Sequence, residues 1–179
     1  MKVLAFDLLD KIKLSDIEFL IEYLPLNRKK KYETITDEKY LKASLLGYFL
    51  LVLLIKDEYG VYYFPDWEEG IKPYDENLGL HFNISHTDNC ICAVISDKKV
   101  GIDVENIKYI KPELIDKIKS NSEEYIYSSN ESNTLFWTQK ESIIKMLGKS
   151  VLSMNKIDIK DFNTVSKMNK KYIISITEE

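Results

Sequence analysis

Residues 101–105 read Gly-Ile-Asp-Val-Glu, and two of the three most informative carboxylates of the chain lie in this stretch. Apolar and acidic residues alternate in it, which predicts a strand with Asp103 and Glu105 on one face. Residues 137–145 predict a helix on which Glu141 and Lys145 are neighbours, because four residues separate them. If the strand and the helix meet, three carboxylates gather beside a lysine. Two like charges about 4 Å apart repel by about 4 kcal/mol at an effective dielectric near 20, so such a cluster favours a divalent cation.

The bulk composition narrows the class of protein. A chain of 179 residues, 45% of them apolar, suits one domain or two small halves with a sizeable core. A net charge of −4 argues against a general nucleic-acid binder. Cys90 and Cys92 are too few for a disulfide framework and predict small strand residues. The chain opens without a signal-peptide pattern, and its longest apolar run, residues 45–55, is too short to span a bilayer. We therefore expect a cytoplasmic protein outside the membrane.

The local pattern predicts a mixture of helices and strands. Strands are expected at residues 3–8, 61–64, 81–85, 91–96, 100–104, 156–162 and 172–177. Helices are expected at residues 15–23 with a capping box of Ser15 and Glu18, after Pro25, and at 37–56, 112–119 and 134–147. Loops are expected at residues 69–78 and 120–133, and a hairpin-like turn at residues 97–99. This order of elements predicts the α+β class.

Three sequence motifs in combination resemble those of a known family. Residues 82–86 read Phe-Asn-Ile-Ser-His, residues 101–105 follow, and Trp137, Lys140, Glu141, Ser142, Lys145 and Gly148 complete the set. Together they resemble the 4′-phosphopantetheinyl transferases, and most of all the longer, pseudodimeric kind that acts on carriers of nonribosomal peptide and polyketide synthases. The resemblance covers roughly residues 1 to 155.

The resemblance implies two similar α/β halves related by a pseudo-twofold axis, with the second half shortened. Residues 1–99 would form the N-terminal half with a basic phosphate-binding segment. Residues 100–179 would form the C-terminal half with the metal-binding strand and the catalytic helix.

The resemblance also implies a reaction. The 4′-phosphopantetheine arm of coenzyme A moves to a serine of an apo acyl- or peptidyl-carrier protein, and 3′,5′-ADP leaves. Mg²⁺ is the implied cofactor, with Mn²⁺ as an alternative, and coenzyme A is the co-substrate. The expected protein is a monomer that binds neither nucleic acid nor membrane.

Individual residues take roles by their match to the motifs. Asp103, Glu105 and Glu141 match metal ligands, and Glu141 is also the candidate acceptor of the serine proton. Lys145 matches the lysine that neutralises the pyrophosphate, so Glu141 and Lys145 are the candidate catalytic residues. The positions that match contacts to coenzyme A are Lys30, Lys72, Ser85, His86 and Lys140.

The sequence departs from the family pattern at three places. Ala43 stands where an arginine is usual, and Lys42 beside it is rotated by about 100° on a helix. The usual Gly-Lys-Pro reads Ile71-Lys72-Pro73, with Gly70 one place early, and Asn27 replaces a common basic residue. These departures concern the grip on the 3′-phosphate of coenzyme A.

Plainer interpretations stay open at this point. Asp103 and Glu105 could face solvent, His86 could belong to the core, and Glu141 with Lys145 could be an ordinary helix pair worth a few tenths of a kcal/mol. A non-catalytic module that binds coenzyme A or a carrier protein is the main alternative function. A different Mg²⁺-dependent phosphoryl transferase is a third, although no Gly-x-x-x-x-Gly-Lys-Ser/Thr loop is present.

Overall fold

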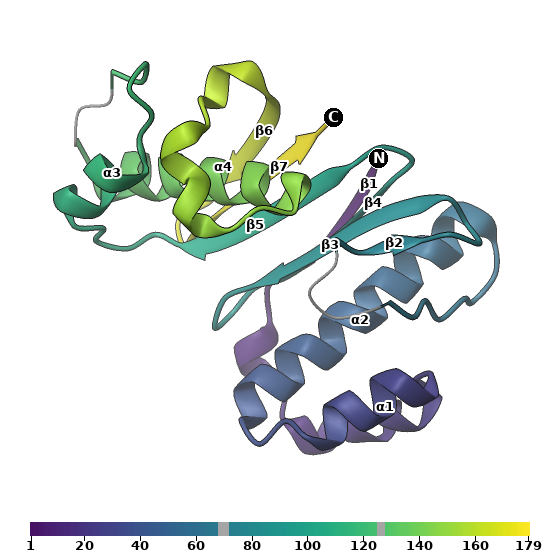
Figure 1. Cartoon of the computed structure of the whole chain (residues 1–179). Coiled ribbons are helices and arrows are strands. Elements are labelled where there is room, and N and C mark those ends of the chain that lie inside the picture. Colours follow the sequence, from purple (N-terminus) through teal and green to yellow (C-terminus); the bar gives the residue numbers. More distant parts are fainter. Residues whose placement is uncertain (68–71, 125–127) are drawn as a thin grey trace. The chain divides into compact units, whose positions relative to one another are not determined.

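The computed structural model describes residues 1–67, 72–124 and 128–179 of the chain (Figure 1). They form two compact units, Met1–Asp97 and Lys98–Glu179. Each unit holds one antiparallel sheet together with helices, so the predicted α+β class is confirmed. Gly70 and Ile71, which belong to one of the sequence departures, lie outside the described residues.

The first unit is built on a four-stranded antiparallel sheet in the order β1-β4-β3-β2. Its strands are β1 (Lys2–Phe6), β2 (Tyr74–Asp75), β3 (Leu80–His86) and β4 (Ile91–Ser96). Strand β4 is central and buried along its whole length, and its register pairs Ala93 with both Leu4 and Ile84. Cys90 and Cys92 are both buried; Cys92 lies in β4 as predicted, whereas Cys90 immediately precedes the strand.

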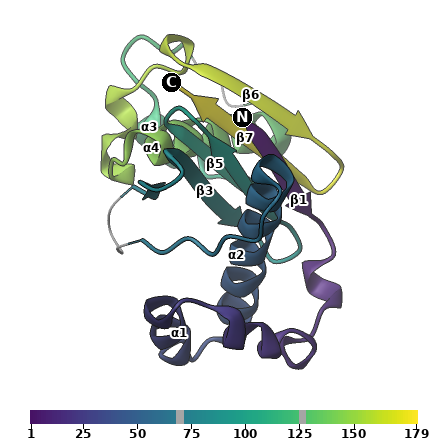
Figure 2. The ribbon, with the colours of Figure 1, turned by 90° about the vertical axis from the view of Figure 1, so that its right-hand side faces the viewer.

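Two helices and three short 3₁₀ segments complete the first unit. The helices are α1 (Leu26–Glu33) and α2 (Glu38–Tyr59), and the 3₁₀ segments are η1 (Leu9–Lys11), η2 (Leu14–Asp16) and η3 (Glu18–Tyr23). Helix α2 starts at its N-cap Asp37, which accepts from the Tyr40 amide, and ends at Gly60 in the left-handed conformation. It packs on the sheet, while α1 and the 3₁₀ segments gather at its N-terminal end (Figure 2).

The second unit is a three-stranded antiparallel sheet in the order β5-β7-β6, with a helix across one face (Figure 1). The strands are β5 (Val100–Asn106), β6 (Asn163–Met168) and β7 (Tyr172–Glu178). The helices are α3 (Pro112–Ile118) and α4 (Asn130–Leu147), followed by the 3₁₀ segments η4 (Val151–Lys156) and η5 (Ile159–Asp161). An apolar cluster around Phe136, Ile143 and Met154 joins α4 to α3 and η4.

Two predicted strands are wrong. Residues 61–64 form no strand; Tyr63 and Phe64 instead pack against the helical core, and the carbonyl of the following Pro65 accepts from the buried Tyr48 hydroxyl. Residues 156–162 are mainly 3₁₀ and turn, because Asp158 caps η5 by accepting from the Lys160 amide. The strand follows at β6, and β2 falls in the segment expected to be a loop.

Three further local predictions fail. Residues 15–23 form 3₁₀ segments, and the cap is made by the Asp16 carboxylate and the Lys13 amide rather than by Ser15 and Glu18. Helix α4 begins four residues earlier than expected, at Asn130, because Ser129 caps it. Strands β4 and β5 do not form a hairpin across residues 97–99, since β4 is already flanked by β1 and β3 and β5 pairs with β7.

The longest helix, α2, is amphipathic and carries charged residues at both ends. In the described ranges, no helix combines the length and the apolar content that crossing a membrane requires.

Candidate functional site

Strand β5 and helix α4 approach each other unusually closely in the second unit. A Cβ atom added at Gly101 would lie 2.1 Å from the Ser142 carbonyl oxygen and 2.4 Å from the Met146 amide nitrogen. Both distances are far below ordinary contact, so only glycine fits at this position. Gly101, Asp103 and Glu105 share the face of β5 that α4 covers, because alternate strand residues point the same way.

This close packing gathers charged side chains. The Lys145 ammonium donates to Asp103 at 2.6 Å and lies 3.6 Å from Glu141. Asp103 is almost fully buried, whereas the Glu141 and Lys145 side chains are 19% and 28% exposed and can still reach a ligand. Glu105, at the end of the same face, pairs with Lys108 at 2.7 Å.

The cluster changes the acidity of Glu141. Burial raises the pKa of Glu141 to about 6, and the negative charges of Asp103 and Glu105 add to the increase. Lys145 opposes them by stabilising the carboxylate. The three carboxylates therefore influence one another, and Glu141 is poised to exchange a proton near neutral pH.

The donor chemistry of this cluster fits a hard divalent cation. All three side chains offer carboxylate oxygens, which Mg²⁺ prefers. Burial first, and then the charges of Asp103 and Glu105, raise the pKa of Glu141. Among the described residues, no three His, Cys, Asp or Glu side chains are grouped tightly enough to hold a metal ion as they stand. In this arrangement the Lys145 ammonium supplies the compensating charge between Asp103 and Glu141.

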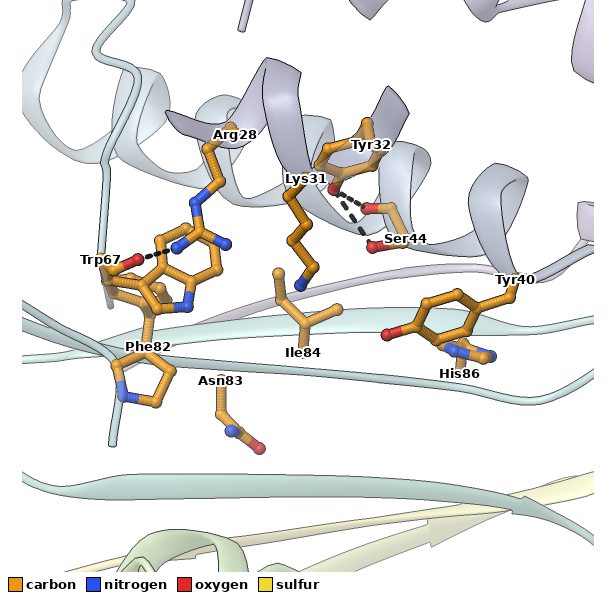
Figure 3. Close-up of a pocket in the computed structure, with 11 residues that line it drawn as sticks. Arg28, Lys31, Tyr32, Tyr40, Ser44, Trp67, Phe82, Asn83, Ile84 and His86 are labelled. Atoms are coloured by element: carbon orange, nitrogen blue, oxygen red, sulfur yellow. Dashed lines mark hydrogen bonds between the residues drawn. The ribbon is translucent and has the colours of Figure 1, made fainter. Parts of the chain in front are cut away.

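The first unit contains a separate pocket between α1, the start of α2 and strand β3 (Figure 3). It has a volume of about 230 Å³. Its lining is aromatic and cationic, with the rings of Tyr40 and His86 5.9 Å apart at one end and Trp67 at the other. A flat apolar ring and an anionic group are what such a lining recognises.

Two cations from α1 line this pocket. Arg28 is buried, stacks over the Trp67 ring with its guanidinium carbon 3.5 Å from the ring centroid, and donates to Asp66 and to the Trp67 carbonyl. Lys31 reaches down from α1 into the space between Trp67 and Tyr40 (Figure 3). Lys30, the residue expected from the sequence, is exposed and absent from the lining.

Of the other residues of the first unit that were expected to contact the cofactor, one lines this pocket and two lie outside it. His86 lines the pocket, and Ser85 is buried but outside its lining. Lys72 lines a neighbouring hollow together with Tyr63 and Asp66.

The position of the missing arginine is likewise outside the pocket. Ala43 is buried in the core, and Lys42 donates to the carbonyls of Leu9 and Ile12 at 2.8 Å each. Lys42 therefore does not replace the arginine.

Lys140 has a different environment from its predicted one. Its side chain is fully buried, and its ammonium binds the Glu123 carboxylate and the carbonyls of Met154 and Ile157. Glu123 in turn accepts from the backbone amides of Ser120 and Ile159. In this structure Lys140 fastens α4 to the segments around it and presents no charge at the surface.

The sequence predicted phosphate binding for the basic segment of residues 28–31 but favoured Lys30 within it, and it gave no role to Gly101 or Tyr40. Arg28 and Lys31 are three apart on a helix and share a face with the buried Tyr32, which is the signal that distinguishes them from Lys30. For Gly101 the signal was its place two residues before Asp103 on the covered face of β5.

The fold and the cluster define a class: an α+β protein whose strand-borne and helix-borne carboxylates meet beside a lysine. Comparison with known proteins supports the same class. The model of the 4′-phosphopantetheinyl transferase superfamily matches residues 99–177, which include β5 and α4.

Curated relatives match most of the chain. It is 31% identical over 168 residues to the 4′-phosphopantetheinyl transferase gsp of Aneurinibacillus migulanus, covering 86% of this chain and 65% of that protein. It is 26% identical to psf-1 of Bacillus pumilus, covering 84% and 70%, and 26% identical to Sfp of Bacillus subtilis strain 168, covering 75% and 64%. The matched region thus spans about two thirds of the length of these relatives. Residues 99–177 thus match the 4′-phosphopantetheinyl transferase superfamily, and the chain as a whole is similar to its members.

Proposed function

We propose that this protein transfers the 4′-phosphopantetheine arm of coenzyme A to a serine of an apo carrier protein. The observation that carries the proposal is the arrangement of Asp103, Glu141 and Lys145, in which a buried acid, a half-buried acid and an ammonium share one site. The names of the relatives support it, since each is a 4′-phosphopantetheinyl transferase.

In the proposed reaction the serine oxygen attacks the β-phosphorus of coenzyme A. The new bond joins that oxygen to phosphorus, and the bond to the bridging oxygen breaks. The electron pair leaves with 3′,5′-ADP, and the serine proton passes to Glu141, directly or through one water. A carboxyl with a pKa of about 6 is mostly ionised at pH 7 and can accept that proton.

The charges of the site fit this chemistry. Asp103, Glu105 and Glu141 would hold Mg²⁺, with Mn²⁺ as an alternative. When bound, the ion would neutralise charge on the pyrophosphate. Lys145 would orient the same pyrophosphate and stabilise the charge that develops on the leaving oxygen.

We further propose that the pocket of the first unit receives the adenosine end of coenzyme A. Tyr40 and His86 would contact the base or ribose, and Lys31 would pair with a phosphate. Lys30, Lys72 and Ser85 would contact coenzyme A from outside this pocket. Lys140 does not, because its ammonium is engaged in the interior.

The symmetry of the fold, the oligomeric state and the cellular location are also proposals. We propose that residues 1–99 and 100–179 are the two functional halves, related by a pseudo-twofold axis. The protein would act as a cytoplasmic monomer on acyl- or peptidyl-carrier proteins, without binding nucleic acid or membrane.

A direct assay tests the proposed reaction. The chain is incubated with Mg²⁺, coenzyme A and several apo carrier proteins, and each carrier is weighed by mass spectrometry. We expect the carrier serine to gain one phosphopantetheine group, and the gain to disappear with EDTA and in the Asp103→Asn variant. Coenzyme A binding by calorimetry without any carrier gain, beside a working control transferase, would favour the non-catalytic binding module instead.

A further inference from the structure

The surface between α4 and its sheet carries hydroxyl groups in place of the usual aliphatic side chains. Thr138, Ser142, Ser175 and Thr177 are completely buried there. Thr138 and Ser142 are one turn apart on α4, and Ser175 and Thr177 face them from alternate positions of β7. Buried hydroxyls of this kind are costly unless each one finds a partner.

The hydroxyls form two rows that run from the edge strand to the helix. In one row Thr164 of β6 lies 2.8 Å from Thr177, which lies 2.7 Å from Ser142. In the other, Ser166 lies 2.9 Å from Ser175, which lies 2.8 Å from Thr138.

Each row has a direction. Ser142 donates to the carbonyl of Gln139 at 2.8 Å, and Thr138 donates to that of Leu135 at 3.0 Å. A hydroxyl has one proton to donate, so Thr177 must donate to Ser142 and Ser175 to Thr138. Aligned hydroxyl chains of this kind strengthen each other.

The rows continue in register onto β5. Thr177 is the Cα partner of Gly101, and Ser175 is the partner of Asp103. The row that ends at Ser142 therefore lies beside the glycine that lets α4 approach, and the other row lies beside the buried acid. A shift of α4 by one turn, about 5.4 Å, would separate both rows at once.

We infer that these two rows set the position of α4 along and around its axis, and thereby hold Glu141 and Lys145 over Asp103. Thr177 and Ser175 are positioning residues that act through α4, without touching substrate. The inference rests on the proposed transfer reaction for its kinetic consequence, whereas its structural consequence stands on the geometry of this unit alone.

The test compares three substitutions at one row. Thr177→Val keeps the shape and removes the hydroxyl, Thr177→Ser restores the hydroxyl, and Thr164→Val removes the far end of the row, which reaches Ser142 of α4 only through Thr177. All kinetics are measured at least ten degrees below each variant's melting temperature, so that loss of folded protein does not enter.

We expect Thr177→Val to lower kcat by about tenfold while KM for coenzyme A stays the same, because a helix displaced by a fraction of an ångström misplaces Glu141 and Lys145. Thr177→Ser should recover most of the rate, and Thr164→Val should retain it. A purely structural role predicts a lower melting temperature with an unchanged kcat, and that result would overturn the inference.

A second readout needs no activity. The Lys145 ammonium, held by Asp103, should give a slowly exchanging ¹⁵N side-chain signal by NMR in the wild type and in Thr177→Ser, and lose it in Thr177→Val. An unchanged signal in Thr177→Val contradicts the inference. If Thr177→Val does not fold, Ser142→Ala removes the same hydrogen bond from the helix side and is judged by the same two outcomes. Absence of transfer in the wild type would reject the proposed function only, since the NMR comparison would still decide the positioning role.

Discussion

Substitution of Gly101 by alanine gives the sharpest test of how the site is built. The new Cβ would lie 2.1 Å from the Ser142 carbonyl oxygen and 2.4 Å from the Met146 amide nitrogen. Both are backbone atoms of α4, so no side-chain rotation can relieve the clash. A normal contact of about 3.2 Å requires α4 to retreat by about 1 Å, since non-bonded atoms repel steeply below their optimal separation.

The retreat should affect stability and activity to different extents. Overpacking of this kind costs about 1–3 kcal/mol, or a fall in melting temperature of about 3–10 °C for a chain of this size. The Lys145–Asp103 distance of 2.6 Å would lengthen by about 1 Å as well. Misplacement of catalytic groups by about 1 Å can lower the rate about 100-fold.

The assay measures the melting temperature and the transfer rate of Gly101→Ala on an apo carrier protein. Gly47→Ala is the matched control, because there the new Cβ would meet side-chain atoms, the Ile84 Cγ2 methyl at 2.6 Å and Ile91 Cδ1 at 3.0 Å, instead of backbone, in the unit that does not hold Glu141 and Lys145. The control should keep kcat at saturating coenzyme A. Wild-type rate and stability in Gly101→Ala would refute the idea that close approach of α4 and β5 builds the site.

Three further predictions follow from charged side chains. Lys31→Ala should weaken coenzyme A binding by about 10- to 100-fold and leave dephospho-coenzyme A binding unchanged. Lys30→Ala, at a contact outside the pocket, should weaken coenzyme A binding far less, and calorimetry that finds Lys30 the stronger determinant would reverse the assignment. The folded-state pKa of Glu141 is raised from its ordinary 4.5 to about 6, so the ionised carboxylate destabilises the fold increasingly as pH rises through that window. In metal-free buffer Glu141→Gln should therefore raise the free energy of unfolding in urea by up to about 2 kcal/mol at pH 7 and leave it unchanged at pH 4, while transfer is lost. An equal effect on the free energy of unfolding at both pH values would contradict the pKa shift. Lys140→Met should lower the free energy of unfolding by about 3–5 kcal/mol, because Glu123 loses its ammonium partner and stays as a largely buried charge. The KM of this variant for coenzyme A should equal the wild-type value. A raised KM at preserved stability would show instead that Lys140 contacts coenzyme A.

The elements that sequence predicted well are those whose pattern is local. Helix α2 has an N-cap at Asp37 and a C-terminal glycine at Gly60, and the strands around residues 81–96 alternate or run apolar without interruption. Some errors have a local cause, such as the caps made by Asp158 and Ser129, whereas the pairing of β5 depends on a remote partner. Asp103 lies next to Ser175, more than 70 residues away, and nothing near residue 103 reveals that β7 rather than β4 is its neighbour.

The candidate site divides along the same line. Spacing alone places Glu141 beside Lys145, because an i, i+4 pair on a helix needs no tertiary information. The meeting of Lys145 with Asp103 depends on a glycine whose importance comes only from the backbone packed against it. Lys140, adjacent to Glu141 in sequence, faces the interior and binds Glu123, so membership of a motif did not predict its environment.

Single-residue rotation explains the remaining difference between sequence and structure. Lys30 and Lys31 are adjacent, yet successive helix residues are about 100° apart, and only Lys31 turns toward the pocket with Arg28. The same rotation separates Lys42, which binds the carbonyls of Leu9 and Ile12, from the buried Ala43. A lost arginine on one helix is therefore not replaced by its sequence neighbour. In the proposed site the pocket receives its cations from α1 instead, so the face of α1 on which a lysine lies, rather than the number of its lysines, determines phosphate binding.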